Sequence, residues 1–292
     1  MAEDAARGAA GGKLILCGEH AVVYGHPAIA LGVDRQTRVT VRPVPGALRL
    51  RDAEGHRIDD PRLAEAVRTV LSDEWEVRIE SDLPIGRGMG SSAALAVALV
   101  RAVAAARGEA LDAATTHERA FAVERVFHGN PSGIDHAVAA RGGVVRFRRT
   151  EAGPELVSLP VPSWSLVVLD SGTAGDTKRL VAGVASRRPG IDPHLEAIGD
   201  IVGDVERSLH DVDALGPLLL ENHRLLRAIG VSDEALDYLV DLAMDTGATG
   251  AKLAGAGGGG VVIALAHQPE RVLAAARAQG IQGFVCRPTS TA

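Results

Sequence analysis

The chain has 292 residues, enough for one large domain or for two of about 150 residues each. Its 46% hydrophobic and 23% charged residues are typical of folded globular chains and argue against disorder. The 31 basic and 37 acidic side chains give a net charge of −6, and without a long basic run nucleic acid is a poor candidate partner.

The apolar stretches are too short for a membrane span. The longest, Ala93 to Val100, falls far short of the roughly 20 residues that a transmembrane helix needs. The acidic start, Met1 to Asp4, differs from the basic start of a secretory signal, so we expect a cytoplasmic protein with no membrane partner. Cys17 and Cys286 cannot form a disulfide framework or a four-thiolate zinc site, and both are expected to be buried thiols.

Short β-branched runs occur among longer helical patterns, which predicts a mixed α+β or α/β fold. The predicted strands are 13–17, 37–42, 76–80, 165–169 and 261–265. The predicted helices are 61–71, 92–107, 112–127, 177–187, 192–209, 211–229, 233–244 and 269–279, many of them preceded or opened by a capping Asp, Ser or Thr. Three prolines between Pro154 and Pro162 interrupt this pattern, and we expect a domain boundary there, giving domains 1–160 and 161–292.

The first predicted strand begins with Lys13 and is followed by a Glu-His pair, Glu19 and His20. Only three lysines occur, at 13, 178 and 252, and the other 28 basic residues are arginine, so a lysine can indicate a need for a compact point charge. Taken alone, a snorkelling lysine and a hydrogen-bonded loop histidine are the simpler interpretation of Lys13 and His20.

A glycine-rich segment, Pro84 to Ala94, joins a predicted strand to a helix that begins at Ser91 or Ser92. Glycines let backbone amides approach a ligand closely, and a helix N-terminus offers unpaired N–H groups with partial positive charge. The segment therefore predicts a phosphate cradle, although a turn capped by one serine is an alternative. It lacks the lysine that a Walker P-loop requires.

Two acids, Glu124 and Asp135, flank a predicted helix-to-helix corner. Pro131 disfavours helix at Asn130, so one helix should end near His128 and the next should begin with Asn130 as its cap. Such a corner can direct two carboxylates toward one point, where they would suit a metal ion and a proton acceptor. A solvated Glu124 and an Asp135 that favours the helix dipole remain the plainer alternative.

Two other functions have weak support in the sequence. Gly255, Gly257 and Gly260 formally match a dinucleotide-binding fingerprint, but an apolar strand pattern rather than a helix follows them, which favours a glycine hairpin. Asp170-Ser171-Gly172 and Asp245-Thr246-Gly247 resemble the paired loops of aspartic proteases. Asp245, however, ends a helical pattern, and the chain has only 3% aromatic residues.

Taken together, four segments resemble the GHMP small-molecule kinases and are most similar to the mevalonate kinase branch of that superfamily. They are Gly12 to Gly25, Pro84 to Ala94, Glu124 to Asp135 and Lys252 to Gly260. Met89 stands where the family usually has leucine, and Gly11-Gly12-Lys13 stands where it usually has Pro-Gly-Lys. The resemblance implies a two-domain α+β GHMP kinase fold, with an N-terminal domain like domain 2 of ribosomal protein S5 and a C-terminal ferredoxin-like α/β sandwich.

The resemblance also implies an ATP-dependent kinase that phosphorylates mevalonate and requires Mg²⁺. The implied ATP-binding residues are Pro84, Gly86, Arg87, Gly88, Met89, Gly90, Ser91, Ser92 and Ala93. Ser92 and Glu124 would hold the metal, and Asp135 with Lys13 would be catalytic. The implied substrate-binding residues are Lys13, Glu19, His20, Asp135 and Thr177.

Two alternatives stay open at this point: another GHMP kinase, acting on phosphomevalonate, homoserine or a sugar, and a catalytically silent GHMP-fold sensor. The presence of Lys13, Ser92, Glu124 and Asp135 weakens the sensor hypothesis. The oligomeric state, with a homodimer among its options, is also open.

Overall fold

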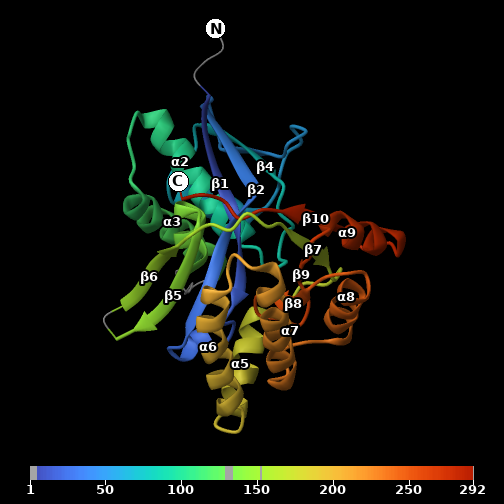
Figure 1. Cartoon of the computed structure of the whole chain (residues 1–292). Helices are drawn as coiled ribbons and strands as arrows, with labels where there is room; N and C mark the ends of the chain where they lie inside the picture. Colours follow the sequence, from blue (N-terminus) through green and yellow to red (C-terminus); the bar gives the residue numbers. More distant parts are fainter. Residues whose placement is uncertain (1–4, 129–133, 152, 292) are drawn as a thin grey trace.

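The computed structural model describes residues 5–128, 134–151 and 153–291, which form two β-sheets with helices packed against them (Figure 1). The first sheet is six-stranded in the order β3-β4-β2-β5-β6, with β1 also paired to β2. Its strands are β1 (Ala6–Cys17), β2 (Pro27–Pro43), β3 (Arg49–Arg51), β4 (Trp75–Ser81), β5 (Val144–Thr150) and β6 (Gly153–Leu159).

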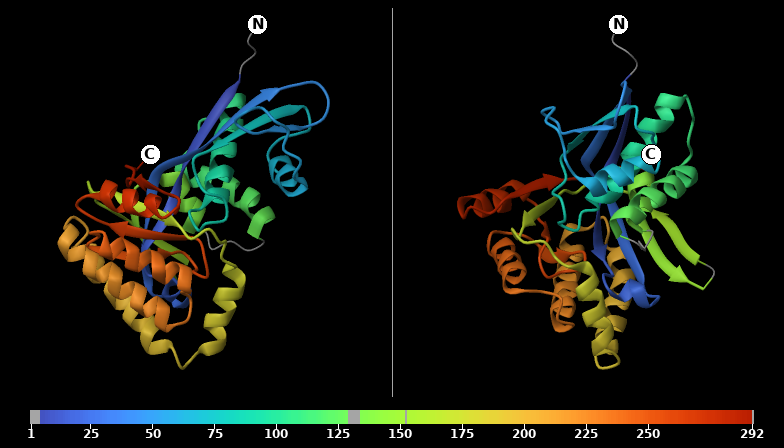
Figure 2. Two further views of the ribbon diagram at one scale, coloured as in Figure 1. Left: turned by 90° about the vertical axis from the view of Figure 1, so that its right-hand side faces the viewer. Right: turned by 180° about the vertical axis from the view of Figure 1, so that it is seen from behind.

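The long strand β2 organises this sheet. It pairs with β1 on one side along most of its length, and on the other side with β5 through its first half and with β4 through its second half. β1 and β2 run in opposite directions, and both span the distance between the outer end of the N-terminal half and the C-terminal half, as Figures 1 and 2 show. This arrangement carries Lys13, in the middle of β1, into the interior of the molecule.

Two helices pack directly on β1 and β2: α2 (Ser91–Arg107) and α4 (Ile134–Arg141). A third, α3 (Ala113–His128), packs on these two and on α1 (Pro61–Arg68), and a short 3₁₀ helix, Ala21–Tyr24, follows β1. The alanine-rich α2 lies directly on β1. A Cβ atom at Gly8 would lie 2.2 Å from the carbonyl oxygen of Ala98, so only glycine permits this close approach. Small side chains on both elements bring the N-terminus of α2 close to Lys13.

The second sheet is four-stranded in the order β10-β7-β9-β8. Its strands are β7 (Leu166–Asp170), β8 (Gly250–Ala254), β9 (Val261–Leu265) and β10 (Gly283–Cys286). The helices of this half are α5 (Thr177–Arg187), α6 (Asp192–Arg207), α7 (Val212–Ala228), α8 (Glu234–Asp245) and α9 (Pro269–Ala278). Antiparallel β8 and β9 enclose the last glycine-rich segment, which confirms the predicted glycine hairpin.

The chain returns to the first sheet after β10, where Val33 bridges Pro288 and Gly142 bridges Thr291. The division at residue 160 remains a prediction. No helix among the described residues is both long and apolar enough to cross a membrane. Cys17 and Cys286 are free and buried, as predicted.

Several strands differ from the predicted ones: β2 begins at Pro27 rather than Thr37, and β3, β5 and β10 were not predicted, while β1 and β6 show a physical reason for the difference. β1 begins at Ala6 rather than Lys13, because glycine and alanine at its start carry little strand signal but fit closely under α2. The proline-rich stretch after Thr150 is partly the strand β6. β6 lies at the edge of its sheet, where Pro154 is tolerated because its missing N–H costs no inner ladder bond.

Candidate active site

The glycine-rich loop between β4 and α2 leads into an uncapped helix N-terminus. Gly86, Gly88 and Gly90 have φ angles of 71°, 81° and 68°, in the left-handed region that favours glycine. Gly90 is the N-cap of α2 and supplies no side-chain hydrogen bond to the first turn. The serine-capped turn is therefore wrong, and the geometry has the features expected of a phosphate cradle.

The glycine hairpin between β8 and β9 lies directly behind this loop. A Cβ atom at Gly88 would be 3.3 Å from the carbonyl oxygen of Ala254, and one at Gly260 would be 3.0 Å from that of Arg87. A Cβ atom at Gly257 would be only 1.9 Å from the carbonyl oxygen of Val231. The hairpin thus needs its glycines for close packing, which fits a role in backing the loop.

Arg87 joins the loop to the second sheet. Its Nε lies 3.2 Å from Asp170 Oδ1 at the end of β7, and its Nη2 donates to the carbonyl oxygen of Gly172 at 3.0 Å. Met89 and Ala93 are buried, so their side chains face the core rather than a ligand. No local sequence pattern indicates the Arg87–Asp170 contact, because its partners lie in different halves of the chain.

Lys13 and Asp135 form an ion pair beside the N-terminus of α2. Lys13 Nζ lies 3.0 Å from Asp135 Oδ1, with the lysine side chain 5% and the aspartate 39% exposed. The lysine stem passes under Gly90, where an added Cβ would be 2.9 Å from Lys13 Cγ. A snorkelling lysine is therefore wrong, because the ammonium group is buried and directed at Asp135.

Glu124 is buried on α3 and faces α2. Ser92 Oγ donates to Glu124 Oε1 at 2.9 Å, and the glutamate is 2% exposed. The pKa of Glu124 is raised to about 7, chiefly by burial; the Ser92 hydrogen bond opposes this shift, the negative charge of Asp135 adds to it, and Lys13 opposes it. A solvated Glu124 is therefore wrong.

The Ser92–Glu124 pair also fits a magnesium site. Hydroxyl and carboxylate oxygens are ligands that a hard divalent cation accepts, and a cation here would favour the ionised form of a carboxyl that burial disfavours. Asn130 to Gly133 of the predicted corner lie outside the described residues, and of the corner helix the structure describes α4 from Ile134. The two helices nevertheless bring Glu124 and Asp135 close enough for their charges to interact, as predicted.

Glu19 and His20 follow β1 and lie between the first sheet and the glycine hairpin that joins β8 to β9. Glu19 is buried and pairs with Lys252 of β8, whose ammonium group also donates to the carbonyl oxygen of Leu253 at 2.6 Å. His20 Nε2 lies 2.9 Å from the carbonyl oxygen of Ala256, and burial lowers the pKa of the ring. The sparse use of lysine had singled out Lys252, but nothing in the sequence pointed to Glu19, 233 positions away, as its partner.

Thr177 is the first residue of α5 and is exposed, next to the N-cap Asp176. The substrate-binding roles of Glu19, His20 and Thr177 stay predictions.

The aspartic protease alternative is wrong, because its two aspartates do not lie on matching loops. Asp245 ends the helix α8, whereas Asp170 ends a strand and contacts Arg87.

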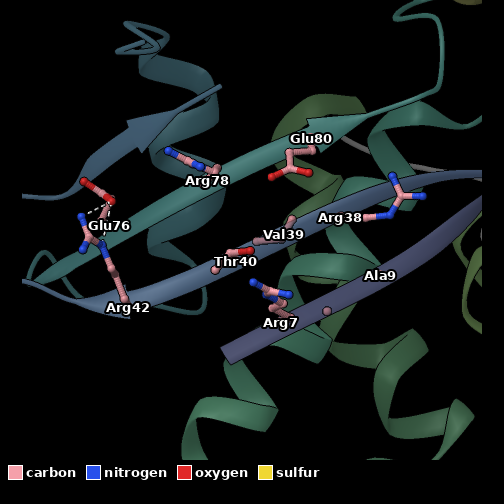
Figure 3. A pocket seen from close by; sticks show the side chains of 10 residues that line it. Arg7, Ala9, Arg38, Val39, Thr40, Arg42, Glu76, Arg78 and Glu80 are labelled. Atoms are coloured by element: carbon pink, nitrogen blue, oxygen red, sulfur yellow. Dashed lines mark hydrogen bonds and ion pairs between the residues drawn. The ribbon is translucent and has the colours of Figure 1, made fainter. Parts of the chain in front are cut away.

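A hollow of about 620 Å³ lies elsewhere, on the outer face of β1, β2 and β4 (Figure 3). Its polar side chains alternate outward along the strands, as on a solvated sheet face. Arg42 pairs with Glu76 at 2.7 Å and Arg38 with Asp82 at 3.1 Å, so much of its charge is paired locally. None of the predicted site residues lines it.

Comparison with known proteins agrees with this geometry. The family models for the GHMP kinase N-terminal and C-terminal domains match residues 62–143 and 201–282. Mevalonate kinase of Pyrococcus horikoshii is 35% identical, covering 90% of this chain and 89% of its own. That of Methanothermobacter thermautotrophicus is 34% identical, covering 86% and 87%.

Solved structures show the same fold. A crystal structure of L. major mevalonate kinase in complex with R-mevalonate has a TM-score of 0.88 and 28% identity, covering 99% of this chain and 98% of that one. Mevalonate kinase from methicillin-resistant Staphylococcus aureus has a TM-score of 0.73 and 30% identity, covering 96% and 98%. The expected mixed two-domain fold is confirmed. This chain therefore belongs to the GHMP kinase family and, within it, to the mevalonate kinases.

Proposed function

We propose that the protein transfers the γ-phosphate of ATP to the 5-hydroxyl group of mevalonate, giving ADP and 5-phosphomevalonate. The observation that carries this proposal is the pairing of Lys13 with Asp135 beside the Ser92–Glu124 contact, at an uncapped helix N-terminus. Phosphoryl transfer needs alignment and charge neutralisation more than covalent chemistry, and these groups can supply both.

In this proposal the backbone of the loop from Gly86 to Ser91 binds the phosphates, because its glycines admit a ligand close to the amides. Ser92 and Glu124 would hold Mg²⁺, which neutralises phosphate charge when bound. Arg87 is held by Asp170 and Gly172, so it fixes the loop against the second sheet.

Asp135 accepts or orients the proton of the acceptor hydroxyl. Its side chain is partly exposed, so an acceptor alcohol can approach it. The ammonium group of Lys13, 3.0 Å from Asp135 Oδ1, pairs with that carboxyl group and is placed to stabilise the attacking oxygen.

The acceptor pocket is proposed to lie near His20 and Thr177, with the Glu19–Lys252 pair behind it. The L. major relative is described in complex with R-mevalonate, which supports mevalonate as the acceptor. ATP and mevalonate are charged, water-soluble compounds, and we propose the cytoplasm as the compartment of the reaction.

The test is ADP release with Mg²⁺ and ATP across mevalonate, phosphomevalonate, homoserine and galactose, followed by identification of the product. We expect turnover with mevalonate and formation of 5-phosphomevalonate. Preference for another acceptor would reject the substrate assignment, and no turnover with any of the four would favour a sensor.

A further inference from the structure

The short helix α4 carries Asp135, and between Asp135 and Arg141, where the structure describes its side chains, it buries very few large ones. Its described residues from Asp135 to Arg141 include three alanines, at 137, 139 and 140. Among these residues, only His136 and Val138 bury a side chain larger than alanine. Val138 packs with Ala28, Ala30, Val145 and Phe147 of the first sheet, which leaves His136 as the large buried contact with α3.

His136 is completely buried between the two helices that carry the catalytic acids. Its ring stacks on His117 of α3, with centroids 4.4 Å apart and planes 28° apart, and it contacts Phe121 with centroids 5.1 Å apart. His117, Phe121 and Glu124 are spaced four and three residues apart, so they lie along one face of α3. The face of α3 that holds Glu124 is thus the face against which His136 packs.

This contact is unusual for a histidine, because neither ring nitrogen of His136 has a hydrogen-bond partner among the described residues. Burial and the nearby His117 lower the pKa of His136 to about 4, so the ring is neutral near pH 7. An apolar side chain would fill this position without burying two unsatisfied nitrogens. The stabilising contribution of His136 therefore comes from its flat ring, which stacks on the flat ring of His117.

We propose that His136 is a positioning residue. Its ring, stacked on His117 and packed against Phe121, sets the rotation of α4 about its axis relative to α3. This rotation keeps the Asp135 carboxyl group paired with Lys13 and close to Glu124. The inference rests on the proposed kinase function and deepens it. Asp135 and His136 are adjacent, so a rotation of α4 about its axis moves both side chains together. Misplacement of a reacting group by about 1 Å can cost of the order of a hundredfold in rate.

The test compares His136→Ala, which removes the ring, with His136→Phe, which restores an aromatic ring but not the nitrogens. We expect His136→Ala to lower kcat tenfold or more with the KM for ATP within about twofold, and His136→Phe to bring kcat back to within about threefold of the unsubstituted enzyme. Val138→Ala is the matched control, because it removes buried volume from the opposite face of the same helix. It should lower the melting temperature with less than a twofold effect on kcat.

Three results would overturn the inference: full turnover in His136→Ala, an equal loss in His136→Phe, or an equal loss in Val138→Ala. If mevalonate is not the acceptor, the same ratios measured with the true acceptor still decide the role of His136. Hydrogen exchange of the α4 amides decides it without any turnover. We expect exchange at residues 138–141, whose amides donate to carbonyl groups within α4, to be at least tenfold faster in His136→Ala and close to normal in His136→Phe, and unchanged exchange in His136→Ala would reject the inference.

Discussion

Glu124 and Asp135 are the same chemical group in different surroundings, and the surroundings suit them to the different tasks that we propose. Asp135 is partly exposed and forms an ion pair with the buried ammonium group of Lys13, 3.0 Å away. Glu124 is buried and bonded to a serine hydroxyl, and burial raises its pKa to about 7. Two carboxyl groups in such different environments can take separate roles, one in proton transfer and the other in cation binding.

Asp135→Asn keeps the shape of the side chain but removes the charge that pairs with Lys13. We expect turnover to fall roughly 10²-fold or more, in the range that general-base and electrostatic contributions reach, with little change in ATP affinity. Steady-state kinetics, nucleotide titration and a melting curve measure these effects. A folded Asp135→Asn enzyme with near-normal turnover would show that Asp135 is only an acid at a helix start.

Glu124→Gln should behave differently, because it removes a proposed magnesium ligand rather than the proton acceptor. We expect weaker binding of the metal–nucleotide complex, with turnover partly recovered as the magnesium concentration is raised. Titrating magnesium at fixed ATP, with Asp135→Asn as the variant that magnesium does not rescue, separates the two roles. Equal rescue of both variants would contradict the assignment of Glu124.

At the scale of elements, the N-terminus of α2 is placed by close backbone packing. Gly8 lets β1 and α2 approach, and Gly90 turns the chain into the helix directly over the stem of Lys13. These two contacts bring the phosphate loop and the Lys13–Asp135 pair to the same end of α2. Glycine is needed at both positions for space, and at Gly90 also for its left-handed φ angle.

Gly90→Ala tests this placement, and the chain offers a matched control. Gly90 and Gly46 both have left-handed φ angles, of 68° and 92°, but an added Cβ at Gly46 would meet nothing within 4 Å. Backbone strain of about 1 kcal/mol should lower the melting temperature of both variants, and the contact with Lys13 should lower that of Gly90→Ala further. Only Gly90→Ala should also displace Lys13 and lower turnover, which we expect to fall at least tenfold. Comparable turnover in the two variants would show that the contact of Gly90 with Lys13 is unimportant.

The elements differ in how far their sequences predict them. Most helices follow from their apolar periodicity and capping residues, and α5 begins and ends as expected because Asp176 caps it. β6 was missed because proline normally argues against a strand, and its edge position, which removes the objection, depends on sheet order. The first half of β1 could not be predicted, because its small residues permit close contact with α2 but have low strand propensity.

At the scale of the whole molecule, contacts between distant segments complete the site. The Glu19–Lys252 and Arg87–Asp170 pairs each join the first sheet or its loop to the second sheet. Each of the four motifs is local in the sequence, so the residues proposed to surround the phosphates could be named from it. The partners that hold those motifs together could not be predicted, since no local pattern links residues on different sheets.

The stability of the whole fold should depend on pH through two buried groups, Glu124 and His136, whose pKa values are shifted in opposite directions. Glu124 has a pKa of about 7 in the folded protein against 4.5 as its ordinary value, so the folded state holds more protons between these values and Glu124 makes stability fall as pH rises. His136 has a pKa of about 4 against 6.5, so the unfolded state holds more protons between these values. Its contribution to stability is therefore lost as pH falls from about 6.5 to 4.

The two pH dependences of stability, from Glu124 and from His136, partly cancel in the unsubstituted chain. Substituting one residue at a time separates them. Urea unfolding at several pH values should show His136→Phe gaining stability relative to the unsubstituted chain by about 1–2 kcal/mol as pH falls from 6.5 to 4, because phenylalanine cannot take up a proton. Glu124→Gln should show the opposite trend, losing relative stability as pH falls from 7 to 4.5, because it cannot take up the proton that the buried carboxyl binds. A stability difference between His136→Phe and the unsubstituted chain that does not vary with pH would mean that His136 takes up its proton equally well in the folded state. Since its ring is buried between α3 and α4, such a result would require those helices to open readily in acid.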